Sequence, residues 1–184
     1  MANRSYLYTY HLGEDRQYRD LAEWNSKIPI AHLLLVGAAP TVCKSAIWDV
    51  EPEIAIKGDA ALSRPLLLDF LEWMTPQVGS PRFKDAVIEA REMIEREDRK
   101  GSHYHLEVGE IYELEGVVPE KMASGTALIA DVAEDLFNEV QRITGKPASS
   151  FADFEDEQLK GLGNSWESEF GLNFSHVLYY HLGG

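Results

Sequence analysis

The sequence has little that could hold a fold together apart from packing. Cys43 is its only cysteine, so no intramolecular disulfide can form, and a reducing compartment suits such a chain. The start lacks the apolar stretch and the small-residue cleavage site of a signal peptide. The longest apolar stretch, Ile28–Ala39, contains Pro29 and is shorter than the roughly 20 residues that span a bilayer. We therefore expect a cytoplasmic protein that does not enter a membrane.

Basic residues are also scarce. The 184 residues include 17 Lys and Arg against 31 Asp and Glu, which gives a net charge of −14. Such a surface repels nucleic acid and anionic lipid and attracts basic proteins. The excess is uneven, because residues 1–100 hold 16 acids and 13 bases whereas residues 101–184 hold 15 acids and 4 bases. The apolar share of 45% and the charged share of 26% are ordinary for a folded domain, and the length predicts one domain over residues 1–184.

Sequence motifs with a specific chemistry are missing as well. The serines have no Gly-x-Ser-x-Gly setting, the glycines do not have the spacing of a phosphate-binding loop, and the acidic stretch after Ser150 lacks the register of a calcium loop. From the motifs alone we expect no catalytic residues, no metal and no cofactor.

The pattern of apolar residues predicts an α+β protein in which a small, mainly antiparallel sheet packs against several helices. The expected strands are Ser5–Tyr10, Glu53–Lys57, His103–Val108, Glu110–Leu114 and Leu172–Leu182. The expected helices are Arg16–Trp24, Pro29–Gly37, Pro40–Trp48, Pro65–Met74 with Ser63 as its N-cap and Pro76 as its stop, Pro81–Gly101, Pro119–Ile143 and Ser150–Leu159. In the Pro81–Gly101 helix, Glu92 is expected to pair with Arg96.

Tyrosines mark both ends of the chain. Tyr6, Tyr8 and Tyr10 share one face of the first expected strand, and Tyr180 lies in the last. If the two strands are neighbours, these side chains cluster. The sequence favours a half-buried sheet face under helices over an interface anchor.

Two histidines could bind a metal. His103 and His105 are two residues apart, so both point to one face of a strand, and His11, His176 or His181 could supply a third ligand. With Glu107 they could also form a carboxylate site of an enzyme. The simpler interpretation is that these are strand histidines at the rim of a sheet.

Cys43 could be a nucleophile. The neighbouring Lys44 could lower the pKa of its thiol, and a histidine elsewhere in the chain could complete a Cys–His pair. A buried, unreactive cysteine is the commoner state and is favoured here.

Two acidic clusters are candidates for binding a basic partner. The first consists of Glu107, Glu110, Glu113 and Glu115, and the second of Asp153, Glu155, Asp156 and Glu157. Each by itself is typical of a solvated face or a helix N-terminus. Together they could form one surface that steers a cationic protein.

Several segments resemble a family of uncharacterised bacterial proteins. They are the opening Met1–Tyr8 (MANRSYLY), Ala22–Asn25 followed by Ile28–Ile30, Ser45–Trp48 and Gly109–Tyr112. The resemblance implies a bacterial α+β protein and leaves its function open. In being small, acidic and without cofactor motifs, the chain is also similar to the immunity proteins of bacterial toxin systems. We therefore predict an acidic protein that neutralises a basic toxin by binding it. The alternatives are an enzyme built on His103, His105 and Glu107, and a self-associating scaffold.

Overall fold

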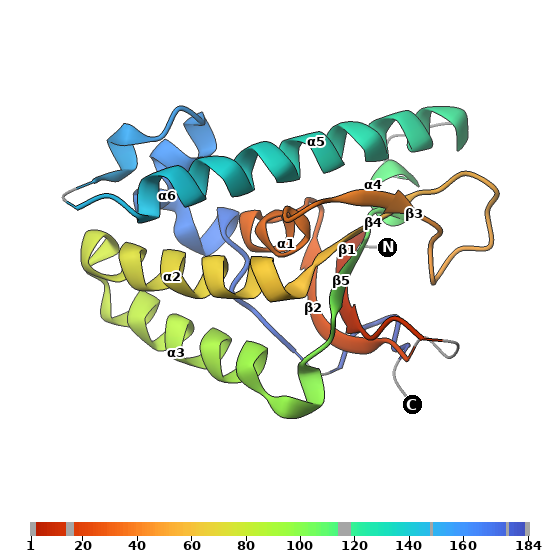
Figure 1. Ribbon diagram of the computed structural model, residues 1–184, viewed down its shortest axis with the longest axis horizontal. Helices are drawn as coiled ribbons and strands as arrows, with labels where there is room; N and C mark the ends of the chain where they lie inside the picture. Colours follow the sequence, from red (N-terminus) through yellow and green to blue (C-terminus); the bar gives the residue numbers. More distant parts are fainter. Residues whose placement is uncertain (1–2, 14–16, 114–118, 148, 176, 183–184) are drawn as a thin grey trace.

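A five-stranded antiparallel sheet organises the computed structural model, which describes residues 3–13, 17–113, 119–147, 149–175 and 177–182 (Figure 1). Its strands are β1 (Arg4–Tyr10), β2 (Arg19–Asn25), β3 (Thr41–Cys43), β4 (Ala55–Asp59) and β5 (His103–Glu107). They lie in the order β2-β1-β5-β4-β3, so the central pair β1–β5 joins segments far apart in the chain.

Alternate side chains divide the sheet into two faces. Leu7, Leu106 and Ile56 are opposite one another on β1, β5 and β4 and point toward the helices. Tyr8 and His105 are opposite each other on the other face.

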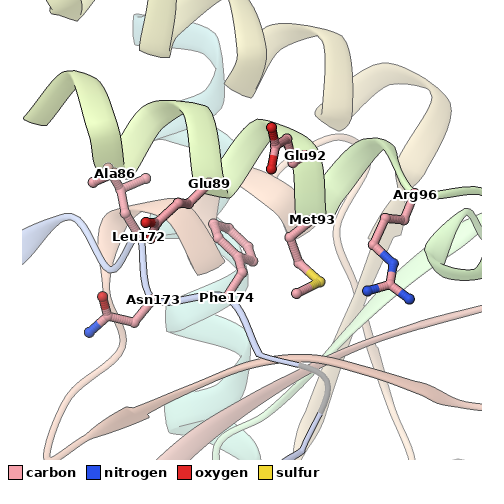
Figure 2. A pocket seen from close by; sticks show the side chains of 8 residues that line it. All are labelled: Ala86, Glu89, Glu92, Met93, Arg96, Leu172, Asn173 and Phe174. Atoms are coloured by element: carbon pink, nitrogen blue, oxygen red, sulfur yellow. The ribbon is translucent and has the colours of Figure 1, made fainter.

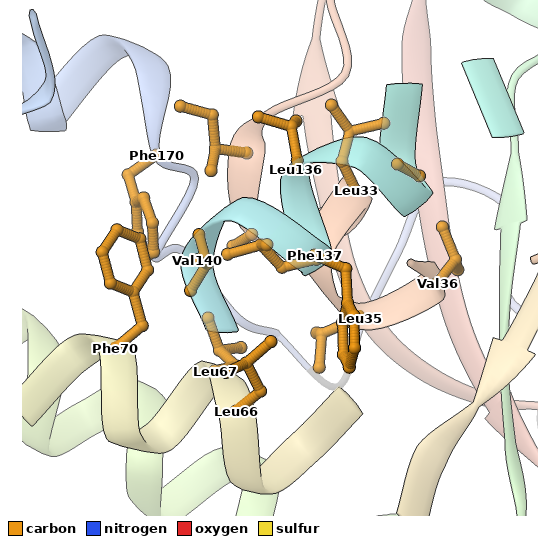
Figure 3. Close-up of a cluster of buried hydrophobic side chains, with 14 of the residues drawn as sticks. Leu33, Leu35, Val36, Leu66, Leu67, Phe70, Leu136, Phe137, Val140 and Phe170 are labelled. Carbon is orange, nitrogen blue, oxygen red and sulfur yellow. The ribbon is translucent and has the colours of Figure 1, made fainter. Parts of the chain in front are cut away.

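The helices are α1 (Ile30–Val36), α2 (Ala60–Val78), α3 (Pro81–Glu95), α4 (Gly109–Glu113), α5 (Pro119–Thr144) and α6 (Glu157–Glu169). Two short 3₁₀ turns add Glu97–Arg99 and Phe151–Asp153. α1, α2 and α5 contact the sheet, and α3 packs on α2 farther out (Figure 1). Their apolar side chains meet in one core, where Val36 of α1, Leu67 of α2 and Val140 of α5 are fully buried (Figure 3).

The α1 helix lies so close to the sheet that β4 needs a glycine. A Cβ atom built on Gly58 would lie 2.3 Å from the carbonyl oxygen of Val36, the last residue of α1. The carbonyl oxygen belongs to the backbone and cannot move aside as the end of a flexible side chain could, so only glycine fits at this position.

Most of the expected architecture is confirmed, including the α+β class and the antiparallel sheet. Strands form at Ser5–Tyr10, Glu53–Lys57 and His103–Val108 within a few residues of the predicted ends, and so do the helices predicted from Pro29, Pro65, Pro81 and Pro119. The helix from Pro81 ends at Glu95, before the predicted Gly101.

Two predicted helices are strands. The expected helix Arg16–Trp24, whose first residue lies outside the described part of the chain, is wrong because Arg19–Asn25 pairs with β1 as the edge strand β2. The expected helix Pro40–Trp48 is wrong because Thr41–Cys43 pairs with β4 as the opposite edge strand β3. In both cases pairing with the adjacent strand of the sheet overrides local preference.

Two predicted strands are not strands. The segment expected at Glu110–Leu114 forms the helix α4 up to Glu113, and Leu114 lies outside the described residues. Among its described residues, the segment expected at Leu172–Leu182 makes one isolated bridge, between Phe174 and Ala22, and forms no strand. Its alternating apolar residues serve packing over a sheet face, which produces the same period of two as a strand.

The α2 helix begins earlier and ends later than predicted. Asp59, not Ser63, is its N-cap, because the Asp59 carboxylate accepts hydrogen bonds from the backbone N–H groups of Ala61 (2.8 Å) and Leu62 (3.1 Å). Pro76 does not stop the helix, which continues to Val78 and ends at Gly79 with a φ of 63°.

Asp59→Ala is expected to lower the free energy of unfolding by about 1 kcal/mol, because two N–H groups lose their acceptor. Ser63→Ala is expected to cost nothing, because the buried Ser63 Oγ has no hydrogen-bond partner among the described residues. Urea denaturation of the two variants checks both expectations. A larger loss for Ser63→Ala would restore Ser63 as the cap.

In the part of the chain that the structure describes, none of the helices has the length and apolar character required for a membrane span.

Candidate functional site

The sheet face that points away from the helices carries a cluster of buried tyrosines. Tyr6, Tyr8 and Tyr10 share this face, as predicted, and each is at most 1% exposed. The C-terminal segment covers Tyr6 and Tyr8: the Tyr8 hydroxyl donates to the carbonyl of Tyr180 at 2.7 Å, and the rings of Tyr6 and Tyr180 are 5.3 Å apart. The ring of Tyr10 lies 5.2 Å from that of Tyr18. The expected clustering therefore occurs, but under the C-terminal segment and not under helices.

Tyr6 and Tyr8 stay protonated. Burial, followed by the charge of a nearby carboxylate, raises the pKa of Tyr6 beside Glu110 and that of Tyr8 near Glu107 well above the usual range. They therefore act as neutral hydroxyl donors. Tyr179, by contrast, is 67% exposed, with the Arg4 guanidinium 5.1 Å from its ring centre.

Beside the tyrosines lies a chain of three reactive groups. Cys43 Sγ is 3.7 Å from His105 Nδ1, and His105 Nε2 is 2.8 Å from Glu107 Oε1. Cys43 is 8% exposed, and His105 and Glu107 are each 1% exposed. A thiol, an imidazole and a carboxylate in this order have the arrangement of an activated nucleophile. We call this group the Cys43 relay.

The other histidines do not join the relay. His103 Nδ1 is hydrogen-bonded to Ser102 Oγ, His181 is bonded to Asp20, and His11 is exposed. His176 lies outside the described residues. Within the described ranges, no three His, Cys, Asp or Glu side chains are grouped to hold a metal ion. The predicted proximity of His105 and Glu107 is observed, but the third histidine ligand expected from the terminal segments is not there among the described residues.

The first acidic cluster is largely engaged within the protein. Glu107 is a buried residue of β5. Glu110 accepts hydrogen bonds from the backbone N–H of Arg4 (2.9 Å) and the Tyr6 hydroxyl (3.1 Å). Glu113 ends α4, and Glu115 lies outside the described residues.

The second acidic cluster lies at the other end of the molecule. Asp153 forms a capping box with Ser150, and Asp156 is the N-cap of α6. Glu155 and Glu157 are exposed, and Glu157 pairs with Lys160 at 2.6 Å. Figure 1 shows α4 beside the start of α5 and residues 153–157 beside its end, so the described residues of the two clusters lie near opposite ends of that helix.

A groove of about 560 Å³ lies between α3 and residues 172–174 (Figure 2). Met93 and Phe174 form its apolar part and pack partly against the core. Two carboxylates of α3, Glu89 and Glu92, line it together with Arg96. A second hollow of about 320 Å³ shares Asn173 with the groove and extends toward Trp24.

The charged groups of the groove that have no partner are carboxylates. Arg96 does not pair with Glu92 as predicted. Instead its guanidinium donates two hydrogen bonds to Asp98, at 2.9 and 2.8 Å, which also lowers the pKa of that carboxyl group. Glu89 and Glu92 are exposed and make no hydrogen bond or ion pair with any residue that the structure describes. The groove therefore offers two unpaired carboxylates beside an apolar surface.

A scan of protein families matches residues 9–146 to a domain of unknown function, DUF7822. The chain therefore belongs to the DUF7822 family. This confirms the resemblance to an uncharacterised family, and the match brings no toxin or immunity function with it. A search of curated proteins found no match, and neither did a search of solved structures. The DUF7822 match includes α3 and the Cys43 relay, whereas residues 172–174 of the groove lie beyond it.

Sequence reasoning missed the groove, and it offered a Cys–His pair for Cys43 without identifying His105 as the partner. Glu89 and Glu92 look like ordinary outer positions of an amphipathic helix, and only the return of the chain at residues 172–174 makes them walls of a groove. Cys43 and His105 are on strands separated by β4, so their proximity depends on strand order and register. The one signal in the sequence was the presence of a single cysteine together with strand histidines.

Proposed function

We propose that this protein is an acidic binding protein that captures a basic protein domain, in the manner of an immunity protein that neutralises a toxin. The observation that carries the proposal is the groove beside α3, in which Glu89 and Glu92 have no partner of their own. Lys and Arg side chains lay their apolar stems on apolar surface and keep their charge at a carboxylate. Met93 and Phe174 supply that surface.

The overall charge supports the same partner. A protein with a net charge of −14 attracts a basic protein before contact, and the unpaired carboxylates then select cationic side chains at contact. Glu155 and Glu157, exposed residues of the second acidic cluster that are outside the caps, contribute to the long-range attraction from another side of the molecule. Long-range attraction thus comes from the whole acidic surface, whereas docking takes place at the groove.

The experiment uses the product of a neighbouring reading frame that encodes a basic, toxin-like protein. The two proteins are expected to co-purify, and the acidic protein is expected to restore growth to cells that produce the basic one. Co-purification of the pair without any effect on toxicity leaves a binding protein that is not an immunity protein. If no basic product binds, the proposal is wrong.

Two double variants with the same charge change test the groove. Glu89→Gln/Glu92→Gln is expected to weaken the affinity for the basic protein at least tenfold, mainly through faster dissociation. Glu155→Gln/Glu157→Gln, in which Asp153 of the capping box and the N-cap Asp156 are left intact, is expected to slow association and to leave dissociation unchanged. Surface-binding kinetics across a salt series measures both rates, and association of the unmodified protein is expected to slow as salt rises. If the association rate is the same at all salt concentrations and in both variants, the acidic residues serve solubility alone.

A further inference from the structure

The register of three strands brings Cys43 to His105. Cys43 pairs with Ala55 on β4, and Ala55 pairs with Glu107 on β5, so all three lie in one row across the sheet. The residue between the thiol and the carboxylate is thus an alanine, whose short side chain leaves room above β4. His105, two residues before Glu107 on the same face, fills that room and contacts both.

The hydrogen bonds around Glu107 determine which nitrogen of the His105 imidazole donates to the carboxylate. Ser45 Oγ accepts from the backbone N–H groups of Ile47 and Trp48, so its own proton is free to be donated to Glu107 Oε2 at 2.7 Å. The backbone N–H of Ala46 donates to Glu107 Oε1. A carboxylate held by these donors accepts the Nε2 proton of His105, so Nδ1 is the ring nitrogen that faces the thiol and can accept its proton. The Cys43 thiol therefore donates to Nδ1.

The imidazole has little freedom to turn away. The His105 ring lies 5.0 Å from the ring of Tyr18 and 6.2 Å from that of Tyr10, measured between centres. A base that is held in one orientation by a carboxylate and by neighbouring rings needs no rearrangement when it takes a proton.

The segment that follows Cys43 contacts the relay. Cys43 is the last residue of the edge strand β3. In the segment that follows it, residues 44–48, Ser45 and Ala46 donate hydrogen bonds to Glu107 of the relay. The C-terminal segment contacts this segment through Tyr180, whose ring is 5.8 Å from that of Trp48. Local opening of such an edge segment takes far less free energy than unfolding of the core.

We propose that Cys43 is a site of reversible modification by small disulfides, activated by His105 and Glu107. The Cys43 proton moves to His105 Nδ1, and the thiolate attacks one sulfur of the disulfide. The new S–S bond forms as the old one breaks, and the leaving sulfur takes up the proton from His105. The incoming disulfide is the oxidant, so no other reactant is required. Thiol–disulfide exchange needs only the nucleophile and proton carrier that the relay provides.

The test is labelling of the native protein with dithiodipyridine, a neutral disulfide whose released thiol absorbs light. One equivalent is expected to react at pH 7, and the labelling rate of native protein is expected to persist at pH 6, whereas the rate of an ordinary thiol falls about tenfold per pH unit below its pKa of about 8.5. His105→Gln and Glu107→Gln are expected to slow labelling at pH 7 at least tenfold. The matched control is His103→Gln, on the same strand and sheet face but outside the relay, which is expected to label like the unmodified protein.

Far-ultraviolet circular dichroism identifies any variant that does not fold. Ser45→Ala, which removes one donor to Glu107 and leaves His105 in place, is a milder variant and is expected to shift the pH profile of labelling upward. Native protein that labels only after denaturant is added, or that labels no faster than folded His105→Gln, overturns the proposal. Neither outcome depends on whether a basic partner exists.

Discussion

Gly58→Ala is expected to lower the free energy of unfolding by about 3 kcal/mol. The new methyl group would meet the carbonyl oxygen of Val36 at 2.3 Å and the Val36 carbonyl carbon at 2.5 Å, so α1 must move away from β4. All residues of α1 are buried between the sheet, α2 and α5, so the movement disturbs the whole core. Urea denaturation followed by tryptophan fluorescence measures the change.

Gly161→Ala is the matched control for this prediction. Gly161 lies on the exposed side of α6, and a Cβ atom there meets nothing within 4 Å. Alanine is expected to stabilise this helix by up to about 1 kcal/mol. If both glycine variants lose the same stability, the loss at Gly58 has a cause other than its contact with α1.

Stability is expected to fall by about 2 kcal/mol between pH 7 and pH 5 because of one buried histidine, His32. His32 is fully buried in α1, and burial lowers its pKa from 6.5 to about 3. Between these values the unfolded chain binds a proton that the folded protein excludes. The contribution is therefore complete above pH 6.5 and is lost progressively as the pH falls toward 3.

The hydrogen bonds of His32 explain why the proton is excluded. Ser5 Oγ donates to the carbonyl of Lys27 at 3.1 Å, so at 3.3 Å it can only accept from His32 Nδ1. His32 Nε2 is buried with no partner among the described residues, so a proton added there finds no acceptor.

Chemical denaturation at pH 7, 6 and 5 measures this pH dependence. His32→Gln is expected to be less stable at pH 7 but to show a much smaller decrease toward pH 5, because glutamine does not titrate. His11→Gln, at an exposed position, is expected to keep the full decrease. If His32→Gln and the unmodified protein lose stability in parallel, another group governs the acid response.

The sequence by itself determined which segments are apolar and with what period, because those features depend on neighbouring residues. It therefore predicted the long helix from Pro119, the amphipathic helix from Pro81 and the strands around Tyr8 and His105. It also determined the net charge and the single thiol. The predicted capping box of Ser150 and Asp153 forms, but the helix expected over Ser150–Leu159 is a 3₁₀ turn, Phe151–Asp153, followed by the separate helix α6 from Glu157.

Edge strands, the C-terminal segment and both candidate sites were decided only by the tertiary structure. Arg19–Asn25 and Thr41–Cys43 are strands because β1 and β4 present free edges to them, which no local preference encodes. The segment after Leu172 has the alternation of a strand but covers a sheet face, since packing on a flat surface selects the same period as a hydrogen-bonded ladder. The Cys43 relay depends on the order β5-β4-β3, and the groove depends on where the chain returns to α3. Contacts between residues far apart in sequence follow from the packing of whole elements, and the pattern within each element does not contain that information.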